Sequence, residues 1–425
     1  MDQQDNLTRR EFLRAPAAGG AICTAGALGR SPEAASPPTA RDRLHSGDGI
    51  FRDAEHQNVV DFYLFWNKLI PETIAYFAGV VKQACGGHQA VGAFYGYMYE
   101  FAGDPEFGHN SLGRFLASPN LDFMAVTANY FNRQSGIGGD YARSPAASVR
   151  LQNKLWYHDN DVVSFVAREK LKAAGYRDDN PDWTRNLSVQ LRSLGYTDTP
   201  EKSRWMYRRG LGFALCNGMF QAWFDLHGGY FDDPELMREV KALNQLAAKA
   251  ASLDRSSIAE ILVIADEVSC ARCHPRSPLL RELLLTPQNQ LIRIGAPVDH
   301  ILLDDLQHLD TSRYKFVIFL NCFQVTPHQR RIIANKLKRD GKHLLWCSAA
   351  GLFSRNESSL EFCRELTGFE FVRTTDNANP VRLEEGYVRK HLDDSDEPFD
   401  VGVLQEGGRR SGLLQRICQL LTTAS

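Results

Sequence analysis

Two aspartates at the end of a predicted strand are the residues of this chain best placed to do chemistry. They belong to the stretch Lys154–Asp161, whose apolar part, Leu155–Tyr157, leads directly into two carboxylates, one imidazole and one amide. A buried strand that delivers acidic groups at its C-terminal end is how an α/β barrel builds an active site. A second interpretation stays open, in which Asp159 and Asp161 cap a helix over residues 162–174, because Asp is a good N-cap residue.

The composition is that of a globular protein. The chain has 425 residues, 43% of them hydrophobic and 24% charged, and a chain of this length predicts two or three domains. Its formal net charge of −2 gives no electrostatic argument for binding nucleic acid or an anionic membrane. No uninterrupted apolar run approaches the roughly 18 residues of a spanning helix, so no membrane anchor is expected.

Residues 1–40 are predicted to be a signal peptide and linker. The paired residues Arg9 and Arg10 precede a weakly apolar stretch, Ala15–Leu28, and then Ser/Pro/Ala-rich sequence to Ala40. This pattern resembles a twin-arginine export signal, which is an address read by a receptor. We therefore expect export through the twin-arginine pathway to the periplasm or the extracellular space.

From residue 50 onwards helix-like and strand-like segments alternate. A broad apolar face predicts a helix over residues 59–84, interrupted at Pro71. Shorter helices are expected over residues 112–116 and 234–253. Four short strands are expected at Val91–Tyr97, Leu121–Val126, within Lys154–Asp161, and at Phe220–Leu226. Such alternation implies a parallel sheet covered by helices.

The following region is predicted to be a second, doubly wound α/β domain. Parallel strands buried on both faces are continuously apolar, which fits residues 258–265, 315–320 and 343–347, with helices over 278–288 and 329–338. Cys347, before Ser348-Ala349-Ala350-Gly351, faintly resembles a nucleophile elbow. No catalytic partner is placed beside Cys347 by any motif, so we interpret it as a buried thiol.

The cysteine spacing and the possible metal ligands do not predict a cofactor. Cys270-Ala271-Arg272-Cys273-His274 matches the c-type haem attachment pattern, but a coincidence in a loop or a local disulfide is the preferred interpretation. No metal-ligand spacing stands out, and no Gly-rich phosphate loop follows a strand. We therefore expect neither a cofactor nor a metal.

A set of motifs, taken in order, resembles bacterial β-galactosidase-like glycoside hydrolases near family 42. In the first region the motifs are Phe94-Tyr95-Gly96-Tyr97, Gly108-His109, Ser118–Phe123, Lys154–Asp161, Arg208-Arg209 and Trp223–Leu226. The next segment is similar to the β-galactosidase trimerisation domain, on Ile261–Glu267, Arg293–Asp299, Tyr314–Asn321 and Arg339–Trp346. The likeness covers roughly residues 50–370.

The resemblance implies a division into parts. Residues 50–255 would be strands five to eight of a (β/α)8 (TIM) barrel, without the first four strand–helix units. Residues 256–370 would be the trimerisation-like α/β domain, of the class I glutamine amidotransferase-like or flavodoxin-like kind, and residues 371–425 a C-terminal tail that includes a helix at Leu413–Leu421.

The resemblance also implies site residues. Asp159 stands at the position of the family's nucleophilic glutamate, and a retaining glycosidase needs a second carboxyl group about 5 to 5.5 Å away. Glu100, Asp122 and Asp225 are the candidates for this second group, with caps and ion pairs as their alternative roles. Further residues near strand ends could bind sugar or could simply pack in the core: Tyr97, Tyr130, Trp156, His158, Asp161 and Trp223.

Two functions stay open. The first is an exported glycoside hydrolase of the β-galactosidase type, acting on a galactoside-like carbohydrate. The second is a catalytically inactive, truncated paralogue that oligomerises or binds sugar. Four strand–helix units cannot close a barrel of eight, so edges and apolar side chains among Phe94, Phe123, Leu155 and Phe224 would stay uncovered. We therefore expect a homo-oligomer.

Overall fold

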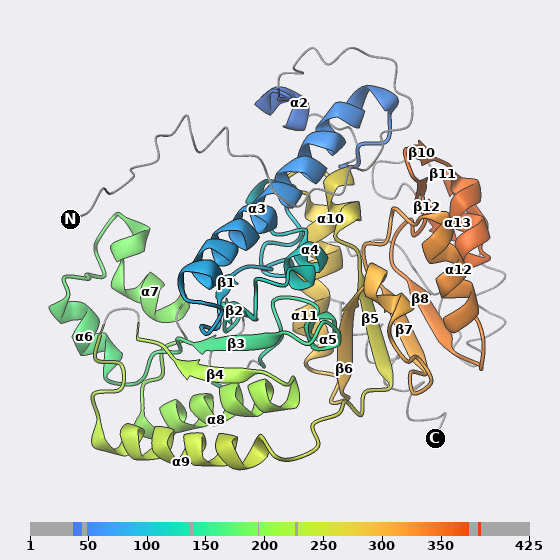
Figure 1. Ribbon diagram of the computed structural model, residues 1–425. Helices are drawn as coiled ribbons and strands as arrows, with labels where there is room; N and C mark the ends of the chain where they lie inside the picture. The colour runs from blue at the N-terminus through green and yellow to red at the C-terminus, as the bar shows by residue number, and fades with distance from the viewer. Residues whose placement is uncertain are drawn as a thin grey trace, which may run out of the picture. The chain divides into compact units, whose positions relative to one another are not determined.

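The computed structural model describes residues 37–44, 49–373 and 381–383, apart from 132, 134, 137, 138, 194, 226 and 227. One compact unit begins at Pro38. The fold is mixed α/β with two parallel four-stranded sheets (Figure 1). Residues 1–36 of the predicted signal region, most of the predicted tail and its Leu413–Leu421 helix lie outside the described residues.

The first sheet contains the predicted strand of the Lys154–Asp161 stretch. Its strands are β1 (Gly92–Phe94), β2 (Phe123–Thr127), β3 (Leu155–Asn160) and β4 (Phe220–Trp223), in that order and all parallel. Thr127 pairs with Asp159, and Asn160 pairs with Trp223. The carboxyl ends of neighbouring parallel strands meet at one edge, so the loops after β1 to β4 converge there.

One face of this sheet is covered by helices. Met124 and Val126 of β2 and Trp156 of β3 belong to a buried cluster with side chains of α4 (Leu112–Ala117), α5 (Ala146–Leu151) and α8 (Pro200–Cys216). Helix α9 (Pro234–Ala250) packs on α8 in turn (Figure 1). Alternate side chains of a strand point to opposite faces, so this layer takes every second residue of each strand.

The other face is open among the described residues. Alternation and register bring five apolar side chains to this face, which we call the open sheet face: Phe94, Phe123, Leu155, Tyr157 and Phe220. The relative exposure of Phe94, Leu155 and Phe220 is 52%, 57% and 42%. The sequence predicted that Phe94 and Leu155 would lack a covering layer, and both are exposed. Phe224, just beyond β4, is also exposed.

The second sheet has strand order β6-β5-β7-β8, again all parallel. Its strands are β5 (Ile261–Ala265), β6 (Val298–Leu302), β7 (Phe316–Phe319) and β8 (His343–Trp346). All five residues of β5 and all four of β7 are buried, as expected for central strands covered on both faces. Helix α12 (Pro327–Lys336) begins with a capping box between Thr326 and Gln329.

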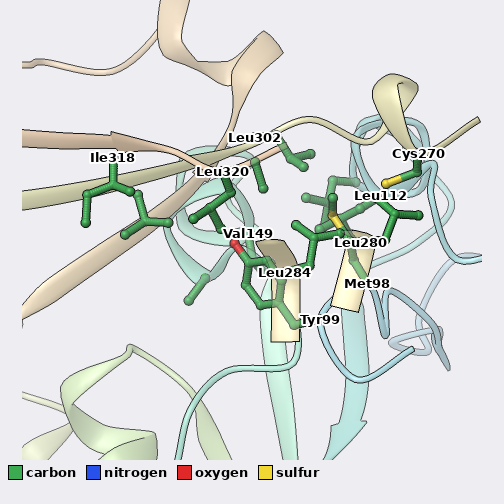
Figure 2. Close-up of a cluster of buried hydrophobic side chains, with 14 of the residues drawn as sticks. Met98, Tyr99, Leu112, Val149, Cys270, Leu280, Leu284, Leu302, Ile318 and Leu320 are labelled. Carbon is green, nitrogen blue, oxygen red and sulfur yellow. The ribbon is translucent and has the colours of Figure 1, made fainter. Parts of the chain in front are cut away.

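A single buried cluster joins the two sheets. Figure 2 shows Met98, Tyr99, Leu112 and Val149 in one cluster with side chains of the second sheet, among them Leu302 of β6 and Ile318 of β7. Polar contacts fix the same junction. Arg150 pairs with Asp299 at 2.7 Å, and the backbone N–H of Leu302 donates to Ser148 Oγ at 2.8 Å. The two sheets therefore share one core within the compact unit.

Several elements differ from the sequence prediction, among them the unpredicted helices α5, α7 (Leu187–Ser193) and α8. Helix α3 (Gln57–Ala84) continues through Pro71 without interruption. Helix α6 begins at Ala167, with Val166 at its N-cap, rather than at residue 162. Strand β6 was not predicted, because Asp299 and His300 break its apolar run, and Asp299 is satisfied by Arg150 and by the Tyr314 hydroxyl at 2.8 Å.

The remaining helices and strands are short. The helices are α2 (Ala40–Leu44), α6 (Ala167–Ala173), α7 (Leu187–Ser193), α10 (Pro278–Leu280), a π-helical turn (Arg281–Leu285), α11 (Thr286–Leu291) and α13 (Leu360–Thr367). Two antiparallel strand pairs complete the described chain: β9 (Phe353–Ser354) with β10 (Glu357–Ser358), and β11 (Phe371–Arg373) with β12 (Val381–Leu383).

Two glycines of α8 give a test of how closely that helix approaches the sheet. A Cβ added to Gly210 would lie 2.4 Å from Asn160 Nδ2, whereas a Cβ added to Gly212 would meet nothing within 4 Å. We expect Gly210→Ala to lower the free energy of unfolding by about 1–3 kcal/mol. The matched variant Gly212→Ala should raise it by about 0.5–1 kcal/mol through helix propensity. Denaturant unfolding measures both, and an equal effect of the two would contradict the close packing.

Candidate active site

The carboxyl edge of the first sheet gathers a set of buried charged groups. Asp159 ends β3, and Asp161 follows two residues later; Glu100 lies in the loop after β1. The loop after β2 contributes Arg133 and Arg143, which are both buried. Three carboxyl groups and two guanidinium groups thus lie out of water at one end of the sheet.

Asp159 is the most perturbed of these carboxyl groups. It is 1% exposed, and its Oδ1 has no hydrogen-bond partner among the described residues. The pKa of Asp159 is raised to about 7, first by burial and then by the nearby charge of Asp161, while Arg133 and Arg143 act to lower it. A carboxyl group that titrates near neutral pH in a protein site is suited to exchange a proton or to act as a nucleophile.

Asp161 is held as an ion pair. Its Oδ1 accepts from Arg133 Nη2, and its Oδ2 accepts from the Tyr130 hydroxyl at 3.1 Å. Arg133 Nη2 also donates to the carbonyl oxygen of Ala128 at 2.8 Å. Because both oxygens of Asp161 are engaged, the proposed capping of the next helix does not occur. That helix begins six residues later, at Ala167.

The ring of Tyr130 lies against two guanidinium groups. The Cζ atoms of Arg133 and Arg143 are each 4.2 Å from the centre of this ring, and Arg143 Cζ is 5.2 Å from the centre of the Tyr97 ring. Cation–π contacts of this kind stabilise a desolvated cation. They also fix the two tyrosine rings beside the carboxyl groups.

Glu100 pairs with the second arginine. Its Oε2 lies 3.4 Å from Arg143 Nε, and both side chains are buried. Burial raises the pKa of Glu100, and Arg143 and Arg133 lower it. The structure therefore places Glu100 at the same edge as Asp159, as the sequence predicted.

The other two carboxylate candidates differ. Asp225 lies at the carboxyl edge after β4, and its Oδ2 accepts from the backbone N–H of Tyr230 at 2.8 Å. Asp122 lies at the amino end of β2, where it pairs with Lys82 at 2.5 Å and accepts from the backbone N–H of Val91. Asp122 was therefore a wrong candidate, because it lies at the opposite edge of the sheet.

Three predicted sugar-binding side chains point away from this edge. Trp156 and His158 alternate with Asp159 and so face the helices; Trp156 is in the buried core, and the His158 ring lies 5.5 Å from that of Phe213 in α8. Burial lowers the pKa of His158 to about 4, so this imidazole is neutral at pH 7.

Trp223 is likewise a packing residue. Its ring lies 5.2 Å from that of Tyr207, and its Nε1 donates to Asn244 Oδ1 in α9 at 2.9 Å. These three assignments were wrong because the side-chain alternation of the strands was not applied to them. Tyr97 and Tyr130 remain as the aromatic side chains that the structure places at the carboxyl edge.

Arg133 and Arg143 were not predicted from the sequence. Both lie in the Gly/Ser-rich loop after β2, where no periodic pattern marks them; an arginine in a loop that follows a parallel strand is the one signal that could have indicated them. Around them, several buried polar atoms have no hydrogen-bond partner within the described residues, which is typical of a site that meets water or a ligand: Asn129 Oδ1, Arg133 Nη1, Tyr141 Oη, Ser144 Oγ and Asp159 Oδ1.

Neither the Cys270–His274 stretch nor Cys347 forms a reactive site in the structure. Cys270 and Cys273 are fully buried in the core shared by the two sheets, and His274 Nε2 lies 2.6 Å from the carbonyl oxygen of Leu44. No disulfide joins the cysteines of the described ranges, so a local disulfide was a wrong alternative. Burial raises the pKa of Cys347 to about 12, and the left-handed residue of its turn is Ser348 (φ 58°), so Cys347 is a buried thiol.

The described part of the chain has one group of side chains with metal-ligand spacing. Asp53, Glu55 and His56 offer ligand atoms within 4.8 Å of one another at the surface, far along the chain from the carboxyl edge. Exposed acidic groups are common without a metal, and this group takes no part in the site. No helix in the described ranges is both long enough and apolar enough to cross a membrane.

Comparison with known proteins returns β-galactosidase structures. No protein-family model matches the sequence, and no curated protein matches it. Among solved structures, a β-galactosidase from Rahnella sp. has a TM-score of 0.47 at 14% identity, over 75% of this chain and 46% of that one. One from the haloarchaeon Halorubrum lacusprofundi has a TM-score of 0.46 at 14% identity, over 74% and 46%.

A third similar structure is a GH42 β-galactosidase from G. stearothermophilus. Its TM-score is 0.37 at 15% identity, over 63% of this chain and 44% of that one. The present chain therefore spans less than half the length of each of these three solved chains.

The buried ion pair gives a test of the site's architecture. Arg133→Met would leave Asp161 buried without its cation, so we expect the free energy of unfolding to fall by about 3–5 kcal/mol. The matched variant Arg208→Met breaks the pair with Glu239, in which the arginine is exposed, and should cost less than about 1 kcal/mol. Denaturant unfolding at pH 7 measures both. Equal losses would mean that the Arg133–Asp161 pair is open to water.

Proposed function

We propose that this protein is a glycoside hydrolase of the β-galactosidase type, which cleaves an O-glycosidic bond by a retaining mechanism with two carboxyl groups. The observation that supports this most directly is Asp159. It ends a parallel strand, is buried, keeps one oxygen without a hydrogen-bond partner among the described residues, and has its pKa raised to about 7. Hydrolases of this class place their carboxyl groups at such strand ends.

In this proposal Asp159 and Glu100 divide the chemistry. The ionised Asp159 attacks the anomeric carbon, and the protonated Glu100 gives its proton to the leaving oxygen. In the second step the Glu100 carboxylate takes a proton from a water molecule, the water oxygen attacks the anomeric carbon, and the bond to Asp159 breaks. Burial raises the pKa of Glu100, which favours the protonated form that this role needs. Asp225 is the alternative proton donor from the same edge.

A galactoside-like carbohydrate is the proposed ligand, without a cofactor and without nucleic acid. Tyr97 and Tyr130, fixed by the Arg143 guanidinium, supply ring faces beside Asp159 on which a sugar could stack. Asp161 acts in this scheme through Tyr130, whose hydroxyl it holds.

We propose domain assignments for the two sheets as well. The first sheet would be strands five to eight of a (β/α)8 barrel, with residues 50–255 as that part. The second sheet would belong to a flavodoxin-like, trimerisation-type domain over residues 256–370. Its strand order, β6-β5-β7-β8, supports this proposal. If the four strands are numbered within the domain, the order is 2-1-3-4, as in the flavodoxin-like kind of doubly wound sheet.

One observation favours a second function, an inactive paralogue that binds sugar. Both carboxyl groups beside Asp159 are already partnered, Asp161 by Arg133 and Glu100 by Arg143. A carboxylate held by a buried arginine is a weak proton donor, because the cation favours the ionised form. Sugar binding without turnover would be the result.

Activity on an aryl β-galactoside separates the two functions. We expect Asp159→Asn to lower kcat/KM on the order of 1,000-fold, while the matched variant Asp122→Asn, at the opposite edge of the sheet, retains full activity. Because the nucleophile must be ionised, kcat/KM should rise as the pH increases through about 7. Sugar binding by folded wild-type protein with no hydrolysis above buffer would support the inactive paralogue instead.

We also propose that copies of the chain associate through helix α3. Its face opposite the buried one carries Phe65, Leu69, Tyr76 and Val80, all exposed. An apolar stripe on a surface helix is self-complementary in a two-fold pair. Light scattering should give a mass above one chain, and Leu69→Asp should reduce it to one chain. Met237→Asp, at an equally apolar exposed position on α9, should leave the mass unchanged; a monomeric wild type would reject the proposal.

Export through the twin-arginine pathway, to the periplasm or beyond, completes the proposal. The paired Arg9 and Arg10 support it. Replacing both with lysine should hold the precursor in the cytoplasm, as seen by cell fractionation. Unchanged export of this double variant would count against the pathway.

A further inference from the structure

A small cavity lies where helix α3, the loop before α4 and the turn after β5 meet. Its volume is about 40 Å³. A water-sized ligand needs about 10–15 Å³, so the cavity has room for one small ion together with a water molecule. None of the proposed catalytic carboxyl groups lines it. The polar residues that do are Tyr63, Asn67, Asn110, Ser111 and Glu267.

Asn110 brings an unused side-chain oxygen to this cavity. Its Nδ2 donates to the carbonyl oxygens of Gly103 and Asp104, at 2.9 and 3.3 Å, and these two bonds fix the orientation of the amide. Its Oδ1 is therefore left without a hydrogen-bond partner among the described residues, although Asn110 is only 6% exposed. A buried acceptor without a partner is destabilising unless a ligand or a water molecule satisfies it.

The position of Asn110 is set by its neighbour Asn67 in α3. The Oδ1 of Asn67 accepts from the backbone N–H of Asn110 at 2.9 Å. Its Nδ2 donates to the carbonyl oxygens of Tyr63 and Pro105, at 2.9 and 2.8 Å. These bonds hold the loop before α4 against α3, so the free oxygen of Asn110 is presented from a fixed wall.

Glu267 brings a carboxyl group to the same cavity from the second sheet. It follows β5, and its Oε2 accepts from the backbone N–H of Gly113 at 3.3 Å. The side-chain charges that act on it come from Asp266 and Asp304 and are both negative. No arginine, lysine or histidine of the described ranges pairs with Glu267. A carboxylate in this setting attracts a cation.

The chemistry of the walls selects a monovalent alkali cation. Carboxylate, amide and hydroxyl oxygens are the ligands that hard cations prefer. Calcium takes about six to eight oxygen ligands, more than a cavity of this size presents. One carboxyl group lines the cavity, so a single positive charge balances it. A water molecule alone would satisfy Asn110 but would leave the charge of Glu267 uncompensated.

We infer that this cavity binds a monovalent alkali cation between Asn110 Oδ1 and the carboxylate of Glu267. The ion links the loop before α4 to the turn after β5. Leu112 and Cys270, which lie close to these two residues in sequence, both belong to the core shared by the two sheets (Figure 2). The bound ion therefore stabilises the junction of the sheets, and the inference does not depend on hydrolysis.

Thermal unfolding in chloride salts of different cations tests the inference. At equal ionic strength, sodium or potassium chloride should raise the Tm by about 3 °C over choline chloride, whose cation is too large to enter the cavity. Caesium chloride should give a smaller rise, because its ion is larger. The same Tm in all four salts, or a rise that is independent of ion size, overturns the proposal.

A charge-removing variant locates the ion. Glu267→Gln keeps an oxygen for the N–H of Gly113 but removes the charge, so it should abolish the difference in Tm between the salts. Its matched control is Glu260→Gln, an exposed carboxylate just before β5 that pairs with Lys315, and this variant should retain the difference. A Glu267→Gln variant that responds to the salts as the wild type does overturns the proposal. Should that variant fail to fold, the ion-size series on the wild type still decides.

The pH gives a second readout. The pKa of Glu267 is raised to about 8, chiefly by burial; the N–H of Gly113 lowers it, and Asp266 and Asp304 raise it. A proton and a cation compete for one carboxylate, so the difference in Tm between sodium and choline chloride should be larger at a pH of about 9 than at about 6. Ionisation of Asp266, whose pKa burial raises to about 7, acts in the same direction. A difference that shrinks as the pH rises overturns the proposal. The other titratable or charged groups around the cavity are Arg43, Tyr63, Tyr95, Asp104 and Glu106.

Discussion

The charge balance at the carboxyl edge of the first sheet is the constraint on which the site depends. Three carboxyl groups and two guanidinium groups are removed from water there. Arg133 pairs with Asp161 and Arg143 with Glu100, which leaves the carboxyl group of Asp159 without a cation of its own. An unpaired buried charge is costly, and a group in that position retains its proton instead. The raised pKa of Asp159 is therefore a consequence of the pairing around it.

The shared core sets where these groups can lie. Helix α5 follows the loop that carries Arg133 and Arg143, and it is fixed to β6 of the second sheet through Arg150–Asp299 and Ser148–Leu302. The second sheet therefore anchors the end of the loop that supplies both cations. A site on the first sheet is in this way supported by contacts made more than a hundred residues further along the chain.

Much of this could be predicted from local sequence, and the rest could not. Continuous apolar runs marked β3, β5, β7 and β8, and the carboxyl groups after them could be placed at the strand ends. Arg133 and Arg143 could not be found, because their positions depend on the path of an irregular loop. Trp156 and His158 could have been excluded by strand alternation alone, since Asp159 takes the other face. Strand β6 was missed because two polar residues in it are satisfied by distant partners.

Burial of the cysteines affects how the chain reacts with oxidants. Cys270, Cys322 and Cys363 are buried, Cys347 is largely so, and burial raises the pKa of each of these thiols. A thiol that stays protonated is a poor nucleophile towards oxidants and disulfides. In the folded chain these four thiols therefore react slowly, even in an oxidising compartment. In an unfolded chain all four would be exposed to solvent and could form non-native disulfides. A chain that folds before it meets an oxidant should keep its thiols reduced. A chain that meets the oxidant before it folds should form disulfides that prevent the native fold.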